Sequence, residues 1–365
     1  MTVLPDLPLP SSLRTRQLSD VNGLELYLLE AGDPDAPCIL LLHGFPDLAY
    51  GWRNVMGPLA AAGYFVIAPD LRGYGRTRGW PDAYETELRP FGTLNLVKDL
   101  VALLRELKIR SLHALVGHDF GSPLAAYFAL LRSDMVQRLV LMSAPFPGPP
   151  GLGASRYDMD AALAALEPPR QHYQTYYSGP DANTELLQAP QGLKPFLRAY
   201  FHMKSADWPP NQPYALEGWR AEELAKLPEY YVMRRGQTMA ATVAPALPDT
   251  RCDWLTDDEL DVYCAEYART GFQGGLNWYR CTHDPVLRAE LAMLAGRPLA
   301  MPCWFVSGAS DWGNHQTPGA LKRLEERAAS DYRGTQLIAG AGHWVQQEQP
   351  EATVAALLDA AMTPR

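Results

Sequence analysis

Short apolar runs alternate along the chain with segments of helical periodicity. The runs are rich in Val, Ile and Leu and comprise residues 38–42, 64–68, 112–116, 139–142, 303–306 and 335–338. Apolar runs of this length are typical of parallel strands that are buried on both faces. Between two of them, residues 94–107 place leucines at helical spacing, as in a crossover helix that packs on a sheet. The pattern therefore predicts an α/β protein built on a parallel sheet.

The segment before the first run has a different pattern. Residues 16–30 alternate around Asn22-Gly23, the dipeptide that most strongly favours a two-residue hairpin turn. Two antiparallel strands are therefore expected ahead of the six parallel ones. Together they predict a mostly parallel sheet of eight strands that is flanked by helices.

The alternation breaks in the middle of the chain. The stretch there is rich in proline, tyrosine and tryptophan, and it opens with the hinge-like PFPGPPG at residues 145–151. Because it has helical segments but no series of strands, we interpret it as a helical cap inserted into an α/β core. We expect a core of residues 1–146 and 286–365 and a cap of residues 147–285. Residues 233–251 lack clear periodicity and are expected to form a surface excursion of the cap.

Composition and charge narrow the class of protein. The 365 residues are 47% hydrophobic and 20% charged, close to globular averages, which argues against disordered, fibrous and membrane proteins. A net charge of −9 without basic runs argues against nucleic acid and anionic membranes as partners, and favours a small neutral ligand. No stretch of roughly 18 apolar residues that could span a membrane occurs.

Cysteine usage bears on the compartment. The five cysteines are scattered and contain no C-x-x-C pair, so neither a disulfide framework nor a zinc site is indicated. The first residues show no charged and apolar pattern of an export signal. We therefore expect a cytoplasmic protein without a metal or another cofactor. Whether it is a monomer or a homodimer is left open.

The strongest motif is Gly117-His118-Asp119-Phe120-Gly121, which follows an apolar run and precedes a helix expected from about Pro123. A strand that runs into G-x-D-x-G and then a helix matches a nucleophile elbow, a strained turn that exposes its central side chain. Aspartate has a reference pKa of about 3.9 and is ionised at neutral pH, so it needs no base to become a nucleophile. The motif alone is equally compatible with Asp119 as a helix N-cap.

A second loop favours the nucleophile. His43-Gly44-Phe45-Pro46 directly follows the first parallel run. In the hydrolase fold an oxyanion is held by one backbone N–H from this loop and one from the residue after the nucleophile. These donors are here Phe45 and Phe120.

Two partners for Asp119 follow later strands. His343 lies in a glycine-rich loop after the last apolar run, and Asp311 lies just past the run before it. Both loops are expected at the same edge of the sheet, and the chain order of nucleophile, acid and histidine is that of the hydrolase fold. We expect Asp311 to orient His343. His118 is expected to point away from Asp119 as structural support, and His315 lies in the wrong loop for a base.

Four motifs together resemble the epoxide hydrolase branch of the α/β-hydrolase superfamily: HGFP (43–46), GHDFG (117–121), SGASD (307–311) and GAGHW (340–344). The resemblance covers nearly the whole chain and implies two cap tyrosines that hold and protonate the epoxide oxygen. Tyr279 in GLNWY and Tyr173 in HYQTYY match these positions, although Tyr176 and Tyr177 lie close to the latter. The resemblance also implies that Pro46, Gln174 and Trp278 contact the substrate.

The chemistry explains the need for phenols. A carboxylate that attacks an epoxide expels an alkoxide. This alkoxide is about as basic as hydroxide, whose conjugate acid, water, has a pKa of about 15.7. A phenol of pKa about 10 can protonate it. The expected reaction forms an ester on Asp119, which His343 and water then hydrolyse to a diol. An apolar substrate is expected from the aromatic cap.

Two residues depart from the family's usual pattern, and three other functions compete. The elbow has Phe120 where many members carry tryptophan, and Ser122 where a second glycine is common. Phe45 and Phe120 lack side-chain N–H donors for a halide, which disfavours a haloalkane or haloacid dehalogenase with the same nucleophile. A serine esterase using Ser122 and a non-catalytic ligand-binding protein are the remaining alternatives.

Overall fold

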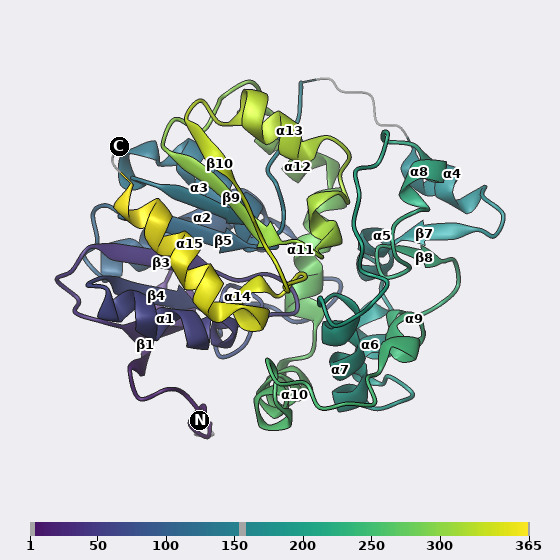
Figure 1. Ribbon diagram of the computed structural model, residues 1–365, viewed down its shortest axis with the longest axis horizontal. Coiled ribbons are helices and arrows are strands. Elements are labelled where there is room, and N and C mark those ends of the chain that lie inside the picture. Colours follow the sequence, from purple (N-terminus) through teal and green to yellow (C-terminus); the bar gives the residue numbers. More distant parts are fainter. Residues whose placement is uncertain (1–3, 153–157, 364–365) are drawn as a thin grey trace.

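The computed structural model describes residues 4–152 and 158–363. One sheet has the strand order β1-β2-β4-β3-β5-β6-β9-β10 (Figure 1). Its strands are β1 Leu13–Val21, β2 Leu24–Ala31, β3 Cys38–Leu42, β4 Phe65–Pro69, β5 Ala114–His118, β6 Leu139–Met142, β9 Cys303–Gly308 and β10 Tyr332–Ile338. Strands β1, β2 and β4 pair antiparallel and the other neighbours pair parallel. The predicted mostly parallel sheet of eight strands is confirmed.

The hairpin forms at the predicted dipeptide. Asn22 and Gly23 both have positive φ, +51° and +77°, as a type I′ turn requires. One expectation about the strands is wrong, because β10 is not buried. It is the edge strand of the sheet, and Leu337 in it is half exposed. An apolar run alone does not show whether a strand has a neighbour on each side.

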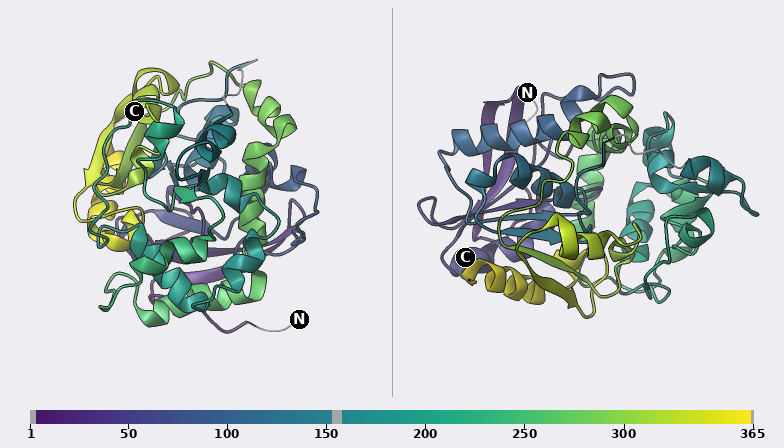
Figure 2. Two further views of the ribbon diagram at one scale, coloured as in Figure 1. Left: turned by 90° about the vertical axis from the view of Figure 1, so that its right-hand side faces the viewer. Right: turned by 90° about the horizontal axis from the view of Figure 1, so that it is seen from above.

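Helices cover both faces of the sheet (Figure 2). The helices of this part of the chain are α1 Arg53–Ala61, α2 Thr93–Glu106, α3 Gly121–Leu131, α12 Pro285–Ala292, α13 Ala320–Arg323, α14 Val345–Glu348 and α15 Pro350–Met362. Strand β3 shows how the faces divide, because Leu40 and Leu42 belong to the apolar cluster with α2 and α3. Ile39 and Leu41 belong to the cluster with α1 and α15. This alternation is the period of two of a strand.

The chain between β6 and α12 forms a mainly helical body beside the sheet, in teal and green in Figure 1. Its helices are α4 Met159–Ala164, α5 Tyr173–Tyr177, α6 Ala182–Leu187, α7 Leu193–Met203, α8 Ala221–Leu224, α9 Met239–Val243, α10 Asp257–Thr270 and α11 Gln273–His283. It also contains a small antiparallel pair, β7 Arg170–His172 and β8 Val232–Arg234, which the sequence pattern did not reveal. We call this body the cap; its expected boundaries at 147 and 285 stay a prediction, and residues 153–157 lie outside the described part.

Residues 233–251 are only in part the surface excursion that we expected, because 234–237 and 247–251 are largely exposed but the residues between them are partly buried. They begin in β8 and contain α9, and Met239, Ala240 and Val243 are buried. A helix of five residues is too short for its periodicity to stand out in the sequence, although its apolar side chains pack in the cap. All five cysteines are unpaired. No helix in the described ranges is both long and apolar enough to cross a membrane.

Candidate active site

Asp119 lies on the sharp turn between β5 and α3. Its φ of +53° is in the left-handed region, which side chains other than glycine seldom adopt. The flanking glycines allow this turn. A Cβ on Gly117 would lie 2.0 Å from the Gly121 carbonyl oxygen, and a Cβ on Gly121 would lie 2.3 Å from the Leu42 carbonyl oxygen. Any side chain at either position would push the strand and helix apart, so the two glycines hold Asp119 out from the sheet edge.

The Asp119 carboxylate is held from two sides. Its Oδ1 accepts a hydrogen bond of 2.9 Å from the Phe45 N–H, and its Oδ2 lies 3.3 Å from Nε2 of His343. The Phe45 loop can come this close because Gly44 has no side chain. A Cβ at Gly44 would lie 2.2 Å from Asp119 Oδ1. Phe120, and not Asp119, occupies the N-cap of α3, and no side chain caps that helix. Asp119 is therefore not a helix cap.

His343 bridges Asp119 and Asp311. Its Nδ1 lies 3.2 Å from each carboxylate oxygen of Asp311. Asp311 is itself fixed, because it accepts a hydrogen bond of 2.7 Å from the Gly313 N–H and one of 3.2 Å from the Ser307 hydroxyl. Both His343 and Asp311 are buried. The histidine thus presents Nε2 to Asp119 while its other ring nitrogen is held by the second carboxylate.

The charges in this cluster stabilise one another. Burial alone raises the pKa of Asp119, but His343 and the Lys204 ammonium outweigh it and hold that pKa well below the ordinary value. The pKa of Asp311 is lowered against burial in the same way, chiefly by His343. Burial and Lys204 lower the pKa of His343, but Asp311 and Asp119 outweigh them, so the net shift is upward. Asp119 is consequently ionised at neutral pH without a base.

Two tyrosines of the cap pack together, and one of them contacts the two phenylalanines beside Asp119. The ring centroids of Tyr173 in α5 and Tyr279 in α11 are 5.8 Å apart, and Tyr279 lies 4.6 Å from Phe120 and 5.4 Å from Phe45. Burial raises the pKa of both phenols, and the charge of Asp119 adds to this. Both tyrosines are therefore neutral and able to donate a proton at physiological pH. These contacts bring together residues from both halves of the chain.

The two hydroxyls differ in their partners. Tyr173 donates to Oε1 of Gln316 at 3.2 Å and accepts a hydrogen bond of 3.2 Å from Nε2 of Gln174. The hydroxyl of Tyr279 makes no hydrogen bond with a residue of the described ranges. Gln174, which was expected to contact the substrate, contacts the Tyr173 hydroxyl in the structure, and its contact with a substrate stays a prediction.

Tyr176 and Tyr177, the neighbours of Tyr173, differ from each other in what their side chains contact. Tyr176 donates to Glu185 at 2.7 Å within the cap. The Tyr177 ring packs on Tyr279 at 5.0 Å, and burial raises its pKa, with neighbouring tyrosines adding to the rise. Among the tyrosines of α5, Tyr173 is the one whose hydroxyl bonds to Gln316, in the loop after β9 that also carries Asp311. A helix of one turn cannot show this difference in the sequence.

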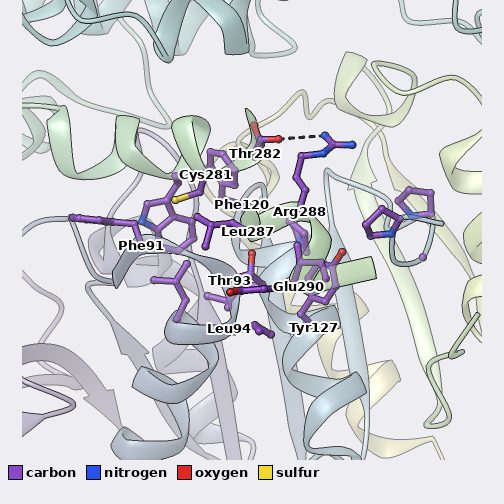
Figure 3. A pocket seen from close by; sticks show the side chains of 18 of the residues that line it. Phe91, Thr93, Leu94, Phe120, Tyr127, Cys281, Thr282, Leu287, Arg288 and Glu290 are labelled. Atoms are coloured by element: carbon purple, nitrogen blue, oxygen red, sulfur yellow. Dashed lines mark hydrogen bonds between the residues drawn. The ribbon is translucent and has the colours of Figure 1, made fainter. Parts of the chain in front are cut away.

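A mainly apolar cavity of about 460 Å³ lies next to Phe120, and none of Asp119, His343, Tyr173 and Tyr279 lines it (Figure 3). Phe120 and Trp278 line it, together with leucines and Phe91, and it lies between α2 and α3 on one side and α11 and α12 on the other. The Trp278 ring packs on Phe120 at 5.6 Å, and its indole N–H is used by a hydrogen bond of 2.9 Å to the Arg72 carbonyl oxygen. Pro46, which follows Phe45, is buried.

Other sequence candidates have structural roles. His118 is buried and makes hydrogen bonds with the His343 carbonyl oxygen and Gln346, and burial lowers its pKa to about 3. It therefore supports the histidine loop as a neutral side chain. The Ser122 hydroxyl is buried and donates to the Ala144 carbonyl oxygen at 2.5 Å, which leaves it unsuited to act as the nucleophile of a serine esterase.

Two buried charged residues at this site had no signal in the sequence. Glu348 accepts hydrogen bonds from the backbone N–H groups of Gly342 and Trp344, on both sides of His343. Lys204 of the cap lies against Trp344 with its ammonium 5.3 Å from the ring. Neither belongs to a motif, and Lys204 is far from His343 along the chain.

The sheet order, the elbow and the acid and histidine loops define an α/β-hydrolase-fold protein. Residues 37–192 match the model of the "alpha/beta hydrolase fold" family. The chain is 35% identical to epoxide hydrolase A of Mycobacterium tuberculosis, over 94% of this chain and 96% of that protein. It is 30% identical to epoxide hydrolase 3 of Siraitia grosvenorii, over 91% and 93%.

Solved structures give the same result. An epoxide hydrolase from an endophytic Streptomyces has a TM-score of 0.78 at 28% identity, and the match covers 96% of this chain and 95% of that one. Epoxide hydrolase A from Mycobacterium thermoresistibile has a TM-score of 0.76 at 34% identity, over 95% and 97%. The chain belongs to the epoxide hydrolase family and is a hydrolase of that family.

Proposed function

We propose that this protein adds water to an apolar epoxide and forms a vicinal diol through an ester on Asp119. The observation that carries the proposal is the surroundings of the Asp119 carboxylate. The charge of this ionised group acts on two neutral phenols, Tyr173 and Tyr279, and the Nε2 of His343 lies at its Oδ2. A nucleophile, acids for the leaving oxygen and a base for water are thus available in one cluster.

In the first step an oxygen of Asp119 attacks a ring carbon of the epoxide. The carbon–oxygen bond of the ring breaks, and its electron pair stays on the oxygen. Tyr173 or Tyr279 gives that oxygen a proton, because an alkoxide is too basic to leave unaided. The products of this step are an alkyl ester on Asp119 and a new hydroxyl group.

In the second step water cleaves the ester. Nε2 of His343 takes a proton from the water while its Nδ1 is held by Asp311. The oxygen of the water attacks the ester carbonyl carbon, and the Phe45 and Phe120 N–H groups stabilise the oxyanion. The diol leaves with the oxygen that Asp119 contributed and takes the proton from the His343 imidazolium. The proton of the resulting Asp119 carboxyl group returns to the tyrosinate left by the first step, which restores the carboxylate and the phenol.

The apolar cavity supports the proposed substrate class. Its lining of Phe91, Phe120, Trp278 and leucines would hold a hydrocarbon or aryl group of a substrate that extends past Phe120. Burying such a group provides about 25 cal/mol for each Å² removed from water. We propose that Pro46 and Trp278 shape the site next to this cavity, and that Gln174 acts through Tyr173.

A dehalogenase is the nearest rival, because it would use the same carboxylate and histidine. It needs N–H donors for a halide, yet Phe45 and Phe120 carry none in their side chains. The indole N–H of Trp278 already donates to the Arg72 carbonyl oxygen. A binding protein without activity would not need an ionised, unblocked Asp119 beside His343. An epoxide panel and a haloalkane panel, assayed for diol and for halide, separate these functions.

The test is to trap the ester. His343→Gln removes the base of the second step but leaves the carboxylate and both phenols in place. After incubation with an epoxide that the unaltered protein hydrolyses, intact-mass spectrometry should show the variant heavier by the mass of one epoxide. Asp119→Ala is the matched control and should stay unmodified. An unmodified His343→Gln variant, with such a substrate, would contradict the proposed mechanism.

A further inference from the structure

Lys204 is a buried cation with no anionic partner in residues 4–152 and 158–363. It follows α7, and only 5% of its surface is exposed. No carboxylate of the described residues lies within 4.0 Å of its ammonium, which makes no hydrogen bond with them. Instead the ammonium lies over four aromatic rings, at 5.3 Å from Trp344, 5.4 Å from Tyr231, 5.5 Å from Tyr200 and 6.0 Å from Tyr230. We call this group the aromatic cage.

The backbone at Lys204 is fixed to the histidine loop. The His343 N–H donates to the Lys204 carbonyl oxygen at 2.9 Å. Glu348 joins the same two segments, because one of its oxygens accepts from the Ala206 N–H at 2.7 Å and from the Gly342 N–H at 2.8 Å. A Cβ on Gly342 would lie 2.5 Å from the Lys204 carbonyl oxygen. The cap thus holds the lysine in a set position relative to His343.

The ammonium acts on all three charged groups of the site. Its charge lowers the pKa of Asp119, of Asp311 and of His343. In the free enzyme His343 lies between two carboxylates, which favour its protonated form. When Asp119 has become an ester it carries no charge. His343 then has one carboxylate, Asp311, and one cation, Lys204, near it.

We propose that Lys204 is a positioning residue for the second step, a fixed counter-charge that keeps His343 unprotonated and ready to accept a proton from water once Asp119 is esterified. The inference rests on the proposed ester on Asp119 and adds to it a role for a residue of the cap. A methionine of similar length would fill the aromatic cage without the free-energy cost of burying an unpaired charge. The charge of Lys204, and not its bulk, is therefore the property that the inference uses.

The other titratable groups around His343 do not prevent a test of this role. His118, on β5, has its pKa lowered to about 3 by burial and is neutral. Asp311, in the loop after β9, is ionised. Burial raises the pKa of Glu348, on α14, to about 7, so Glu348 itself titrates near neutrality. Because Glu348 is unchanged in variants of Lys204, a difference between those variants reports the lysine.

The experiment compares the unaltered protein with Lys204→Met and Lys204→Arg in single turnovers from pH 5 to 9. Enzyme in excess is mixed with an epoxide, and intact-mass spectrometry of quenched samples follows formation and breakdown of the ester. Breakdown should rise with pH as His343 loses its proton. In Lys204→Met the midpoint of this rise should move up by about one pH unit, since removing a cation favours the imidazolium.

At pH values below the midpoint this shift makes breakdown about tenfold slower, and above it the rates should agree within about threefold. Lys204→Arg retains the charge and should restore the midpoint. Ester formation should show no new pH dependence in either variant, because Asp119 stays ionised. A purely structural lysine would change rates without moving the midpoint.

An unmoved midpoint in Lys204→Met overturns the inference, and so does an equal shift in Lys204→Arg. If Lys204→Met does not fold, Lys204→Gln is the second neutral variant, and the same two results decide. Absence of any ester in His343→Gln would remove the proposed function and this inference with it. An ester that forms but decays with an unshifted midpoint removes this inference alone.

Discussion

Replacing Asp311 by asparagine tests whether the second carboxylate drives hydrolysis of the ester. Asp311 is 1% exposed, and both of its oxygens lie 3.2 Å from Nδ1 of His343. With an effective dielectric of about 20, two unit charges about 3.2 Å apart attract by roughly 5 kcal/mol. This attraction stabilises the imidazolium that forms when His343 takes a proton from water. It is absent with a neutral amide.

The geometry changes as well as the charge. The Gly313 N–H donates to Oδ1 of Asp311 at 2.7 Å, so the oxygen of an asparagine stays on that side and its NH₂ takes the place of Oδ2, which the Ser307 hydroxyl and Nδ1 of His343 both approach at 3.2 Å. This NH₂ would face Nδ1 of His343 and favour the tautomer that carries its proton on Nε2. In that form the histidine cannot accept a proton from water. Part of the lost attraction is regained by relaxation, and we expect ester breakdown about 10³-fold slower, equivalent to about 4 kcal/mol.

The assay is a single turnover with enzyme in excess, in which intact-mass spectrometry follows the ester. In Asp311→Asn the ester should form within about threefold of the unaltered rate and then persist. Ser307→Ala is the matched control, because it removes one donor to Asp311 but leaves the charge, and it should slow breakdown by less than tenfold. Breakdown in Asp311→Asn within threefold of the unaltered rate would refute the reasoning.

Three further changes probe the other parts of the site. Tyr279→Phe should slow ester formation about 10²- to 10⁴-fold without slowing ester breakdown. In the control Tyr176→Phe, which removes a hydroxyl bonded within the cap, neither rate should change by more than about threefold. Equal effects of the two substitutions would contradict the assignment of Tyr279 as an acid. Because the pKa of Asp119 is lowered, its carboxylate stays ionised as pH falls to about 5. The rate of ester formation, measured by quench-flow, should therefore not change between pH 5 and 8. A steep fall of this rate in that range would contradict the lowered pKa of Asp119. Ser122→Ala should lower the free energy of unfolding, measured by urea titration, by about 1 kcal/mol, because the hydrogen bond to Ala144 is lost. This variant should still form the diol, whereas it would lose all activity if Ser122 were the nucleophile.

Much of the core could be predicted because buried strands and their loops are local signals. The six apolar runs all fall on parallel strands of the sheet, and Asp119, Asp311 and His343 each follow one of them. Carboxyl ends of parallel strands meet at one sheet edge, so residues that are far apart in sequence come together there. The exposure of β10 was missed, since a run of side chains does not reveal which strand lies at the edge.

The cap was less predictable because its shape depends on contacts between distant segments. Helices such as α5 and α9 have five residues, too few to show a helical period. The partner of the Tyr173 hydroxyl, Gln316, lies 143 residues further along the chain. Lys204 joins the site through the backbone of His343, a contact that no motif marks.

The central claim is that the oxygen added to the epoxide comes from the carboxylate of Asp119. Oxygen from water enters that carboxylate in one turnover and reaches the diol only in later turnovers. A single turnover in ¹⁸O-labelled water, followed by mass spectrometry of the diol and of the peptide containing Asp119, tests it most directly. We expect an unlabelled diol and an Asp119 peptide heavier by one ¹⁸O, because water attacks the ester carbonyl carbon. A diol that carries ¹⁸O in the first turnover, beside an unlabelled Asp119 peptide, would show direct attack by water and contradict the account.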